Sequence, residues 1–151
     1  GTGDQPAIHL AVRKGRSEMV ALLFENGAGP FMPVPVTESE FEATDPEIGR
    51  ARAEECLFCH SLEKDKKPST KFAGPDLAGF VGREIAIRDH FKYSSAMKAK
   101  SGTWEIEELN RFIADPTGVV PGTTMERGGV SDRTERIAVI KFLMIAADSQ
   151  Q

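Results

Sequence analysis

Apolar residues recur with helical spacing in several parts of the chain, and no stretch reads convincingly as a strand. Near the N-terminus, two short amphipathic patterns flank Gly15, and Gly27 is placed as a helix stop. Residues 104–114 carry apolar side chains with a period of 3.6 and end at Asp115-Pro116. Asp132 is positioned to cap a final apolar helix. The sequence therefore predicts an all-α fold of helices and loops.

The middle of the chain divides into a linker and the start of a second helical region. Residues 30–45 are predicted to be a linker, because their prolines favour extended backbone and the acidic cluster that follows repels itself. Asp45-Pro46-Glu47 offers a capping residue, a proline and a first-turn acid, which predicts a helix running towards Cys56. Residues 61–103 are predicted to be mostly loop.

Residues 6–28 resemble a single ankyrin repeat. His9 and Ala11 fit the Thr-Pro-Leu-His-x-Ala turn of that repeat, whereas Pro6 and Ala7 stand where Thr and Pro are usual. A lone repeat cannot bury its own apolar face, because stacked neighbours supply its core. The helix pair predicted for residues 1–29 is therefore expected either to mediate self-association or enzyme docking, or to be a vestigial packing element.

Composition and charge narrow the possible functions. The 151 residues are 40% hydrophobic and 28% charged, a globular balance for one domain with an appendage. No apolar run approaches the roughly 20 residues of a membrane span. The net charge of −4 falls entirely within residues 31–45, and no basic face is available to neutralise phosphates. Neither a membrane span nor nucleic-acid binding is expected.

The chemistry of the chain centres on its two cysteines. Cys56-Leu57-Phe58-Cys59-His60 is the C-x-x-C-H pattern of covalent haem attachment. On a helical turn, this spacing lets two thiols reach the two vinyl groups of a porphyrin while the next residue places an imidazole under the iron. A thioredoxin-like cysteine pair requires a βαβ setting, and a zinc site requires further ligands. The motif therefore favours haem, with these two alternatives still open.

A second signal points to an axial ligand. Pro121-Gly122-Thr123-Thr124-Met125 places a methionine in a tight loop that begins with proline, 65 residues after His60. Ligation by histidine and methionine is the arrangement of electron-carrying cytochromes, in which the thioether raises the potential. Met19 and Met144 lie on apolar helical faces, so Met125 is the predicted second ligand.

Residues 46–147 resemble a class I c-type cytochrome of the cytochrome c2 and mitochondrial cytochrome c branch, with little gapping. The matching residues are Gly74-Pro75-Asp76-Leu77, Gly82-Arg83, Phe91-Lys92-Tyr93-Ser94, Trp104, Leu109, Asp115-Pro116, the loop 121–125, Glu135-Arg136 and Phe142-Leu143. The resemblance implies a class I cytochrome c domain at residues 46–148, with helices around one covalently bound haem c.

The resemblance also implies roles for single residues. It implies thioethers at Cys56 and Cys59 and iron ligation by His60 and Met125. It implies that the carbonyl of Pro75 accepts the hydrogen bond of the ligand imidazole, which fixes the ring and its basicity. It implies contacts to a buried haem propionate from Arg83, Tyr93, Trp104 and Thr123. A buried carboxylate is costly without such donors, although core packing is the alternative role for the two aromatic residues.

Three departures from the mitochondrial branch are visible. Phe112 stands where that branch has a tyrosine whose hydroxyl reaches the methionine sulfur, so this hydrogen bond cannot form. Met97 replaces an asparagine that orders an internal water, so a drier haem side is predicted. Glu55 and Thr124 stand where mitochondrial-type carriers have lysines. The rim of the haem edge is therefore predicted to be nearly neutral, with docking that depends weakly on salt.

The implied function is one-electron transfer and not catalysis, because ligation by His60 and Met125 leaves no open coordination position. The predicted donor is a periplasmic dehydrogenase, and the predicted acceptor is an oxidase or another cytochrome. Haem attachment to thiols takes place outside the cytoplasmic membrane, so the predicted location is the bacterial periplasm, after removal of a signal peptide that this sequence lacks. The alternative function is a haem enzyme or gas sensor in which Met125 is displaced.

Overall fold

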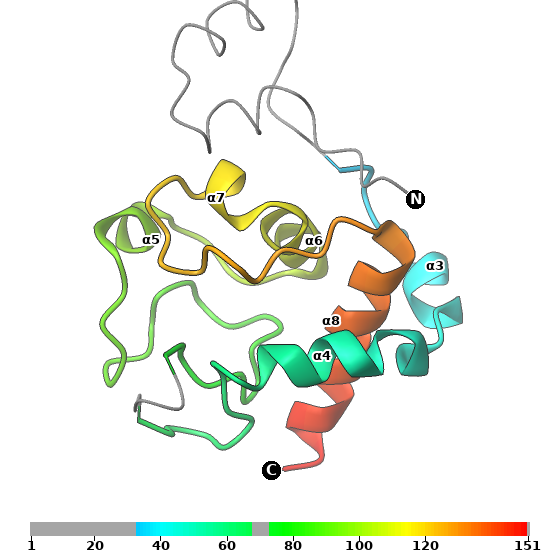
Figure 1. The fold of residues 1–151 in the computed structure, drawn as a ribbon, viewed down its shortest axis with the longest axis horizontal. Coiled ribbons are helices and arrows are strands. Elements are labelled where there is room, and N and C mark those ends of the chain that lie inside the picture. Colours follow the sequence, from blue (N-terminus) through cyan, green and yellow to red (C-terminus); the bar gives the residue numbers. More distant parts are fainter. Residues whose placement is uncertain (1–32, 68–72, 151) are drawn as a thin grey trace, which may run out of the picture.

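A computed structural model describes residues 33–67 and 73–150 (Figure 1). Within these ranges the chain forms helices and loops, with one isolated antiparallel bridge between Glu84 and Thr103, so the all-α prediction is confirmed there. The predicted helix pair of residues 1–29 lies outside the described residues. The helical elements are α3 (Glu38–Ala43), the 3-10 turn η1 (Pro46–Gly49), α4 (Arg50–Cys56), α5 (Ser95–Ala99), α6 (Ile106–Ala114), α7 (Pro116–Val119) and α8 (Arg133–Asp148).

The C-terminal helix α8 crosses η1 and α4, the elements that lead into the cysteine motif (Figure 1). Gly49 makes this crossing possible, since a β-carbon at that position would lie only 2.3 Å from the backbone nitrogen of Val139. The 3-10 turn η1 and the helix α8 begin at the predicted caps, and α4 follows η1 without a side-chain cap of its own. The Asp45 carboxylate accepts from the amide of Glu47 at 3.0 Å, and that of Asp132 accepts from Glu135 at 2.8 Å.

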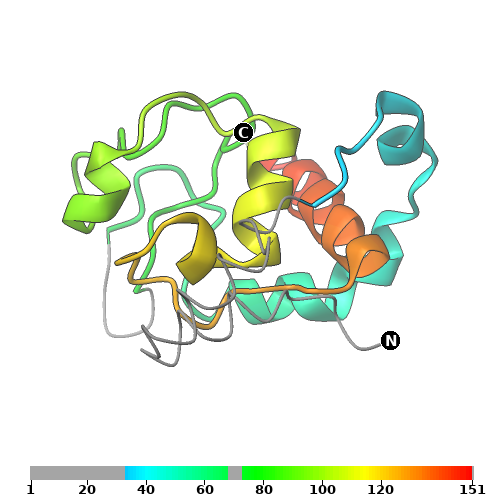
Figure 2. The same ribbon diagram turned by 90° about the horizontal axis from the view of Figure 1, so that it is seen from above.

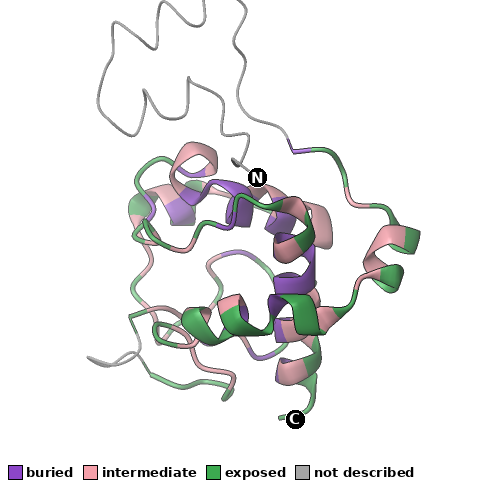
Figure 3. Cartoon of the chain, turned by 45° about the vertical axis from the view of Figure 1, so that its right-hand side comes forward, coloured by how far each residue is buried: buried purple, intermediate pink, exposed green. Residues whose placement is uncertain are grey.

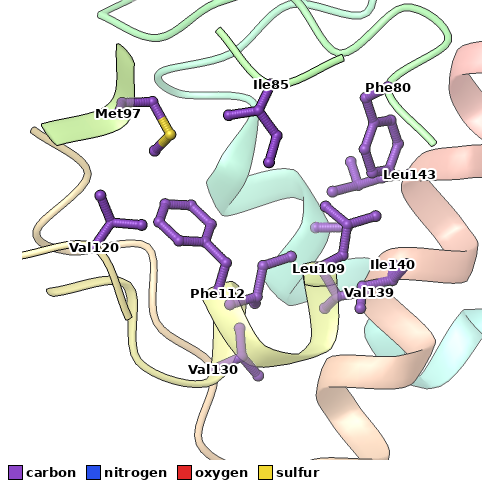
Figure 4. Close-up of a cluster of buried hydrophobic side chains, with 12 residues drawn as sticks. Phe80, Ile85, Met97, Leu109, Phe112, Val120, Val130, Val139, Ile140 and Leu143 are labelled. Carbon is purple, nitrogen blue, oxygen red and sulfur yellow. The ribbon is translucent and has the colours of Figure 1, made fainter. Parts of the chain in front are cut away.

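Buried residues concentrate on α6 and α8, whereas α3 and α4 are mostly exposed or half-buried (Figure 3). In the core, the ring of Phe112 points towards Met97 and Val120 (Figure 4). The hydrophobic cluster comprises Ala53, Phe80, Ile85, Met97, Leu109, Phe112, Ile113, Val120, Val130, Val139, Ile140 and Leu143. Removing this apolar surface from water is the main source of stability for the domain.

A buried polar pair joins α6 to α8. Arg136, only 2% exposed, donates from Nε to Oδ1 of the fully buried Asn110 at 2.9 Å. Its Nη1 donates to the carbonyls of Val130 and Ser131, both at 2.9 Å. Burial is the main cause that lowers the pKa of Arg136. Because these partners satisfy most of the guanidinium, the charge is tolerated inside the core and fixes how the two helices meet.

The structure differs from the sequence prediction at the helix expected over residues 104–114. α6 begins only at Ile106, because Trp104 is held in extended backbone by hydrogen bonds with the segment that contains Arg83. The amide of Trp104 donates to the Arg83 carbonyl at 2.8 Å, and its own carbonyl accepts from Gly82 at 3.0 Å. The short helices α5 and α7 were also not anticipated by the apolar pattern, since neither is long enough to show a period.

Part of the predicted linker is folded and packed on the domain. Residues 38–43 form α3, which lies beside α8 (Figure 2). Arg133 of α8 binds the Glu40 carboxylate with two nitrogens, at 2.9 and 2.7 Å. Lys141 donates to the carbonyls of Glu42 and Thr44 at 2.7 and 2.9 Å. We call residues 33–44 the strap, since cationic side chains of α8 hold it down where a self-repelling linker was expected.

Candidate haem-binding site

The two cysteines lie on a helical turn at the end of α4, as the motif requires. The amides of Cys59 and His60 both donate to the carbonyl of Cys56, at 3.1 and 3.0 Å, so the helix continues as a tight turn through the motif. Cys56 is half-buried and Cys59 is exposed, and the two form no disulfide. Burial raises the pKa of the Cys56 thiol. The turn therefore presents two thiols and an imidazole from five consecutive residues.

The loop at residues 73–77 runs back alongside the motif and fixes the imidazole. The amide of Gly74 donates to Cys59 at 2.8 Å, and that of Leu77 donates to Ser61 at 2.7 Å. These two bonds bring the carbonyl of Pro75 to 2.7 Å from Nδ1 of His60. With the proton on Nδ1 donated to this carbonyl, the lone pair stays on Nε2.

The environment of His60 keeps the imidazole neutral. Desolvation by burial lowers its pKa, opposed by the hydrogen bond to Pro75. Gly74 packs against the ring, since a β-carbon there would lie 2.4 Å from Cε1. Within the described ranges, Nε2 has no hydrogen-bond partner. A neutral, oriented imidazole with an unoccupied nitrogen is the donor that haem iron takes.

Three of the predicted propionate donors, Arg83, Tyr93 and Trp104, lie near one another, and the Arg83 guanidinium donates to Asp76 and to the carbonyl of Ala78. Arg83 and Trp104 are neighbours through their backbone hydrogen bonds. Burial lowers the pKa of Arg83 and raises that of Tyr93, and each of these side chains acts electrostatically on the other. The phenol of Tyr93 therefore stays a donor at neutral pH. The fourth predicted contact, Thr123, is buried in the next loop along the chain.

Met125 follows a sharp turn. The amide of Thr123 donates to the carbonyl of Val120 at 2.9 Å, and Gly122 has a φ of 92°, which favours glycine after the proline at position 121. The amide of Met125 then donates to the Thr123 hydroxyl at 3.3 Å. The loop that follows approaches the methionine closely, because a β-carbon on Gly128 would lie 2.1 Å from Cε of Met125.

The predicted site residues border one hydrophobic cluster. Cys56, Tyr93, Trp104 and Met125 are half-buried and all pack against it. The donor set fits a covalently attached haem: two thiols in a C-x-x-C-H turn, a neutral imidazole held by a carbonyl, and a thioether in a separate loop. An all-helical domain built around such a set defines a c-type cytochrome.

Comparisons with known proteins agree. The chain is 36% identical over 141 residues to a cytochrome c homolog of Bradyrhizobium diazoefficiens, covering 93% of this chain and 72% of that one. It is 35% identical over 105 residues to cytochrome c2 of Rhodomicrobium vannielii, covering 70% and 82%. The solved structure of cytochrome cH from Methylobacterium extorquens matches with a TM-score of 0.59 and 32% identity, covering 67% and 98%. The sequence matches no protein-family model.

The chain belongs to the class I c-type cytochromes, a family of electron carriers that includes cytochromes c2 and cH. It carries one covalently bound haem c. None of these relatives supports an ankyrin-like repeat in residues 1–29. Among the described residues, no helix has the length and apolar character needed to cross a bilayer.

Sequence reasoning missed several residues that shape this site. Gly74 and Gly128 have no chemistry of their own, and only their close approach to His60 and Met125 reveals a role. Gly74 did stand beside Pro75 in the matching residues, and this was the one available signal. Asp76 also stood among the matching residues, but its contacts with Arg83 and Arg88 could not be predicted, because these partners come from loops whose path no periodicity predicts.

Proposed function

We propose that this protein is a one-electron carrier in which His60 and Met125 are the axial ligands of the haem iron. Haem c supplies the Fe(III)/Fe(II) couple. The protein supplies two donors of unequal character, an imidazole whose basicity is set by the Pro75 carbonyl and a thioether that favours the reduced state. With both ligands in place, no coordination position is open to a substrate.

The observation that carries the proposal is the fixed, neutral imidazole of His60. Its Nδ1 is engaged at 2.7 Å, its ring is flanked by Gly74, and Nε2 alone is left to bind a metal. A ligand held from two sides changes position little between oxidation states. This low reorganisation is what an electron carrier needs and what an enzyme with an exchangeable ligand does not.

The surroundings of the proposed ligands exclude water. Phe112 and Met97 are 5% and 7% exposed, and Trp104 packs on Phe112 with ring centroids 5.1 Å apart. Met97 occupies the position at which a water-ordering asparagine was expected from the mitochondrial branch. An apolar wall on this side limits solvent rearrangement when charge changes at the iron, and so supports rapid electron transfer.

Visible spectroscopy of the oxidised and reduced protein, with and without carbon monoxide, tests the proposal. We expect low-spin iron, a weak far-red sulfur-to-iron band when oxidised, and no response to carbon monoxide. Met125→Leu is expected to lose the far-red band and to bind carbon monoxide. Met144→Leu, which changes a half-buried methionine of α8, is the matched control and keeps the parent spectrum. High-spin iron in the parent protein would favour the haem enzyme or gas sensor instead.

The proposed partners are a periplasmic dehydrogenase as donor and an oxidase or another cytochrome as acceptor, with the periplasm as location. Phe58, which is 72% exposed within the cysteine motif, offers an apolar contact where a partner docks. Glu55 and Thr124 are also exposed, which supports a rim without a lysine ring. We expect the second-order rate of electron exchange with the partner to change little with ionic strength, and a steep dependence would contradict this rim.

We also propose that residues 1–29 are an ankyrin-like helix pair that mediates self-association or enzyme docking. The support is the sequence pattern around His9 and Ala11. Deleting residues 1–30 is expected to abolish a dimer or an enzyme complex seen by light scattering with the full chain. Unchanged assembly after the deletion would contradict the docking role.

A further inference from the structure

The start of the strap is bound to α6 and α8 through its main chain. The carbonyl of Val34 accepts from Nδ2 of Asn110 at 3.2 Å and also from Arg133. Nη2 of Arg133 donates to the carbonyl of Pro35 at 3.0 Å, and the amide of Val36 donates to a carboxylate of α6 at 3.0 Å. Three successive residues outside any helix are thus held in the way that a peptide ligand is held, through backbone groups that most sequences offer.

The domain itself needs an acceptor at this place. Asn110 is fully buried, and its Oδ1 accepts from Nε of Arg136 at 2.9 Å. This bond fixes the orientation of the side-chain amide, so that Nδ2 points to Val34. A buried amide nitrogen without an acceptor is costly. The core therefore favours a chain segment that brings a carbonyl to this point.

The surface beneath the strap is positively charged. We call Glu107, Asn110, Arg133, Arg136 and Lys141 the strap-binding face, since these residues bind the strap or support those that do. Its three cations stand against one carboxylate, which gives a net charge of +2. The next acidic residue of α8, at position 135, is turned towards α4, where it pairs with an arginine at 3.8 Å. The strap covers this face with a segment that contains three glutamates.

Two adjacent side chains of the strap complete the recognition. The carboxylate of Glu40 accepts from two nitrogens of Arg133, at 2.9 and 2.7 Å. The ring of Phe41 packs against the hydrophobic cluster, and Nζ of Lys141 lies 5.8 Å from the centre of the ring. A bidentate carboxylate and an aromatic ring beneath a cation are both specific contacts. The face therefore selects an acidic residue that is followed directly by an aromatic one.

The strap is held loosely enough to leave. Among its residues, only Pro33 is buried. The side chains of Glu40 and Arg133 are 35% and 31% exposed, and ion pairs at such positions stabilise little. Elements with few buried apolar contacts open locally while the rest of a domain stays folded. Within the described ranges, the hydrogen bonds that leave the strap end on α6 and α8, so its release leaves the turn of the cysteine motif in place.

We propose that the strap-binding face is a docking surface for an acidic segment of a partner protein, and that the strap is an internal competitor that covers it. The partner segment presents backbone carbonyls and carries an acidic residue followed directly by an aromatic one. The tethered strap competes at an effective concentration of about millimolar, so the face opens only to a partner that is concentrated nearby or binds tightly. The inference goes beyond the proposed function, since it involves neither the haem iron nor the exposed side chain of Phe58.

Calorimetric titration of the full holoprotein with a synthetic peptide of residues 33–45 tests the proposal. The open variant combines Glu40→Gln with Phe41→Ala, two changes in the strap that leave the strap-binding face intact. It is expected to bind the peptide at least about tenfold more tightly than the parent, whose own strap competes. Nuclear magnetic resonance of the Asn110 side-chain amide locates the binding. Val36→Pro, which removes the amide that donates to α6, is a second open variant with the same expected result.

Matched variants and peptides separate recognition from charge. Glu38→Gln combined with Glu42→Gln removes two exposed carboxylates from the strap and is expected to bind the peptide no better than the parent. Arg133→Gln added to the open variant is expected to abolish binding. A scrambled peptide of the same composition is expected not to bind. A second peptide keeps the prolines and the pair of Glu40 and Phe41, has alanine elsewhere, and is expected to bind as the strap peptide does.

Three results would overturn the docking surface. They are no binding to either open variant, equal binding of the scrambled peptide, and binding of the strap's own sequence alone, which would mean that the face serves only packing within the chain. The visible spectrum of the parent decides the axial ligation separately, and it is expected to stay unchanged when the peptide binds. Peptide binding is expected to weaken steeply with ionic strength, in contrast to electron exchange at the nearly neutral haem edge.

Discussion

The α-carbon of Gly74 faces the imidazole of His60, so closely that a methyl group on it would stand 2.4 Å from Cε1 and 2.6 Å from Nδ1. The neighbouring carbonyl of Pro75 holds the same ring at its edge, at 2.7 Å. The dipeptide Gly74-Pro75 thus controls both the orientation of the His60 ring and the position of its proton on Nδ1. Sequence reasoning assigned only the role of Pro75. The role of Gly74 depends on its having no side chain, and a sequence does not show where such a space is needed.

Gly74→Ala is expected to weaken the bond between His60 and iron. The methyl group forces the ring away from its position, and this displacement also lengthens the hydrogen bond to Pro75. We expect altered Soret and visible bands and earlier loss of low-spin iron on acidification. Gly129→Ala, where the nearest atom lies 3.3 Å from the added carbon, is the matched control. A parent-like spectrum for Gly74→Ala would show that the loop yields to the methyl group.

Gly128→Ala is expected to disturb the thioether ligand while leaving the fold intact. The added methyl group meets Cε of Met125 at 2.1 Å, and a free methionine side chain moves aside at little cost. A methionine bound to iron cannot do so. We expect loss or displacement of the far-red band, and carbon monoxide binding, with a helical content of the holoprotein close to that of the parent. The adjacent Gly129→Ala should retain the band, and equal effects of both changes would argue against Met125 as ligand.

Gly49→Ala is expected to destabilise the domain by about 3 kcal/mol, the upper range for overpacking. Its β-carbon would meet the backbone of α8 at Ala138 and Val139, and backbone atoms cannot rotate away as a side chain does. Denaturant unfolding of the holoprotein measures the change. Ala51→Gly on the exposed face of α4 is the control, with an expected cost of about 1 kcal/mol. A comparable cost for the two changes would mean that the crossing is not tightly packed.

The pair of Glu40 and Arg133 is expected to make strap stability depend on pH. The hydrogen bond with Arg133 lowers the pKa of Glu40 from its ordinary 4.5. The contribution is therefore complete above the unfolded value of 4.5 and is lost as the pH falls through the lower folded value. Glu40→Gln is expected to lower the melting temperature at neutral pH by about 2 °C, in line with a half-exposed ion pair.

Thermal unfolding of the parent and Glu40→Gln at pH 7 and at acidic pH measures this contribution. The difference between the two proteins is expected to vanish in acid, where Glu40 is protonated in both states. Glu38→Gln, at an exposed position of the same helix, is the control for the general loss of one acidic group. A difference that persists in acid would mean that Glu40 acts through packing and not through its charge.

Much of the fold could be predicted because its signals are local. The caps at Asp45 and Asp132 form as expected. Each carboxylate stands two or three residues before an amide in the first helical turn, and such an amide has no partner within the helix. The helix expected from Trp104 starts two residues late, because its backbone pairs instead with Arg83, a distant residue that no helical period includes. The strap was missed for the same reason, since Arg133 and Lys141 hold it from the far end of the sequence.

The site residues also differ in whether their partners are close in the sequence. Cys56, Cys59 and His60 lie within five consecutive residues, and their spacing predicts covalent haem attachment. Asp76 and His90 are 14 residues apart in a region of loops, and nothing in the sequence brings them to 3.2 Å. Only the folded loop shows that a buried acceptor and a titratable ring face each other.

The strap also has a mechanical meaning. Pro33 is buried, and Arg133 and Lys141 tie the residues that follow it to α8. A force that pulls on the chain ahead of Pro33 therefore acts first on these contacts. It reaches α8 before it reaches the turn that holds the cysteines. A domain or partner attached to the chain ahead of Pro33 is therefore held at one fixed point of the surface. The pulling force does not pass through the thioethers.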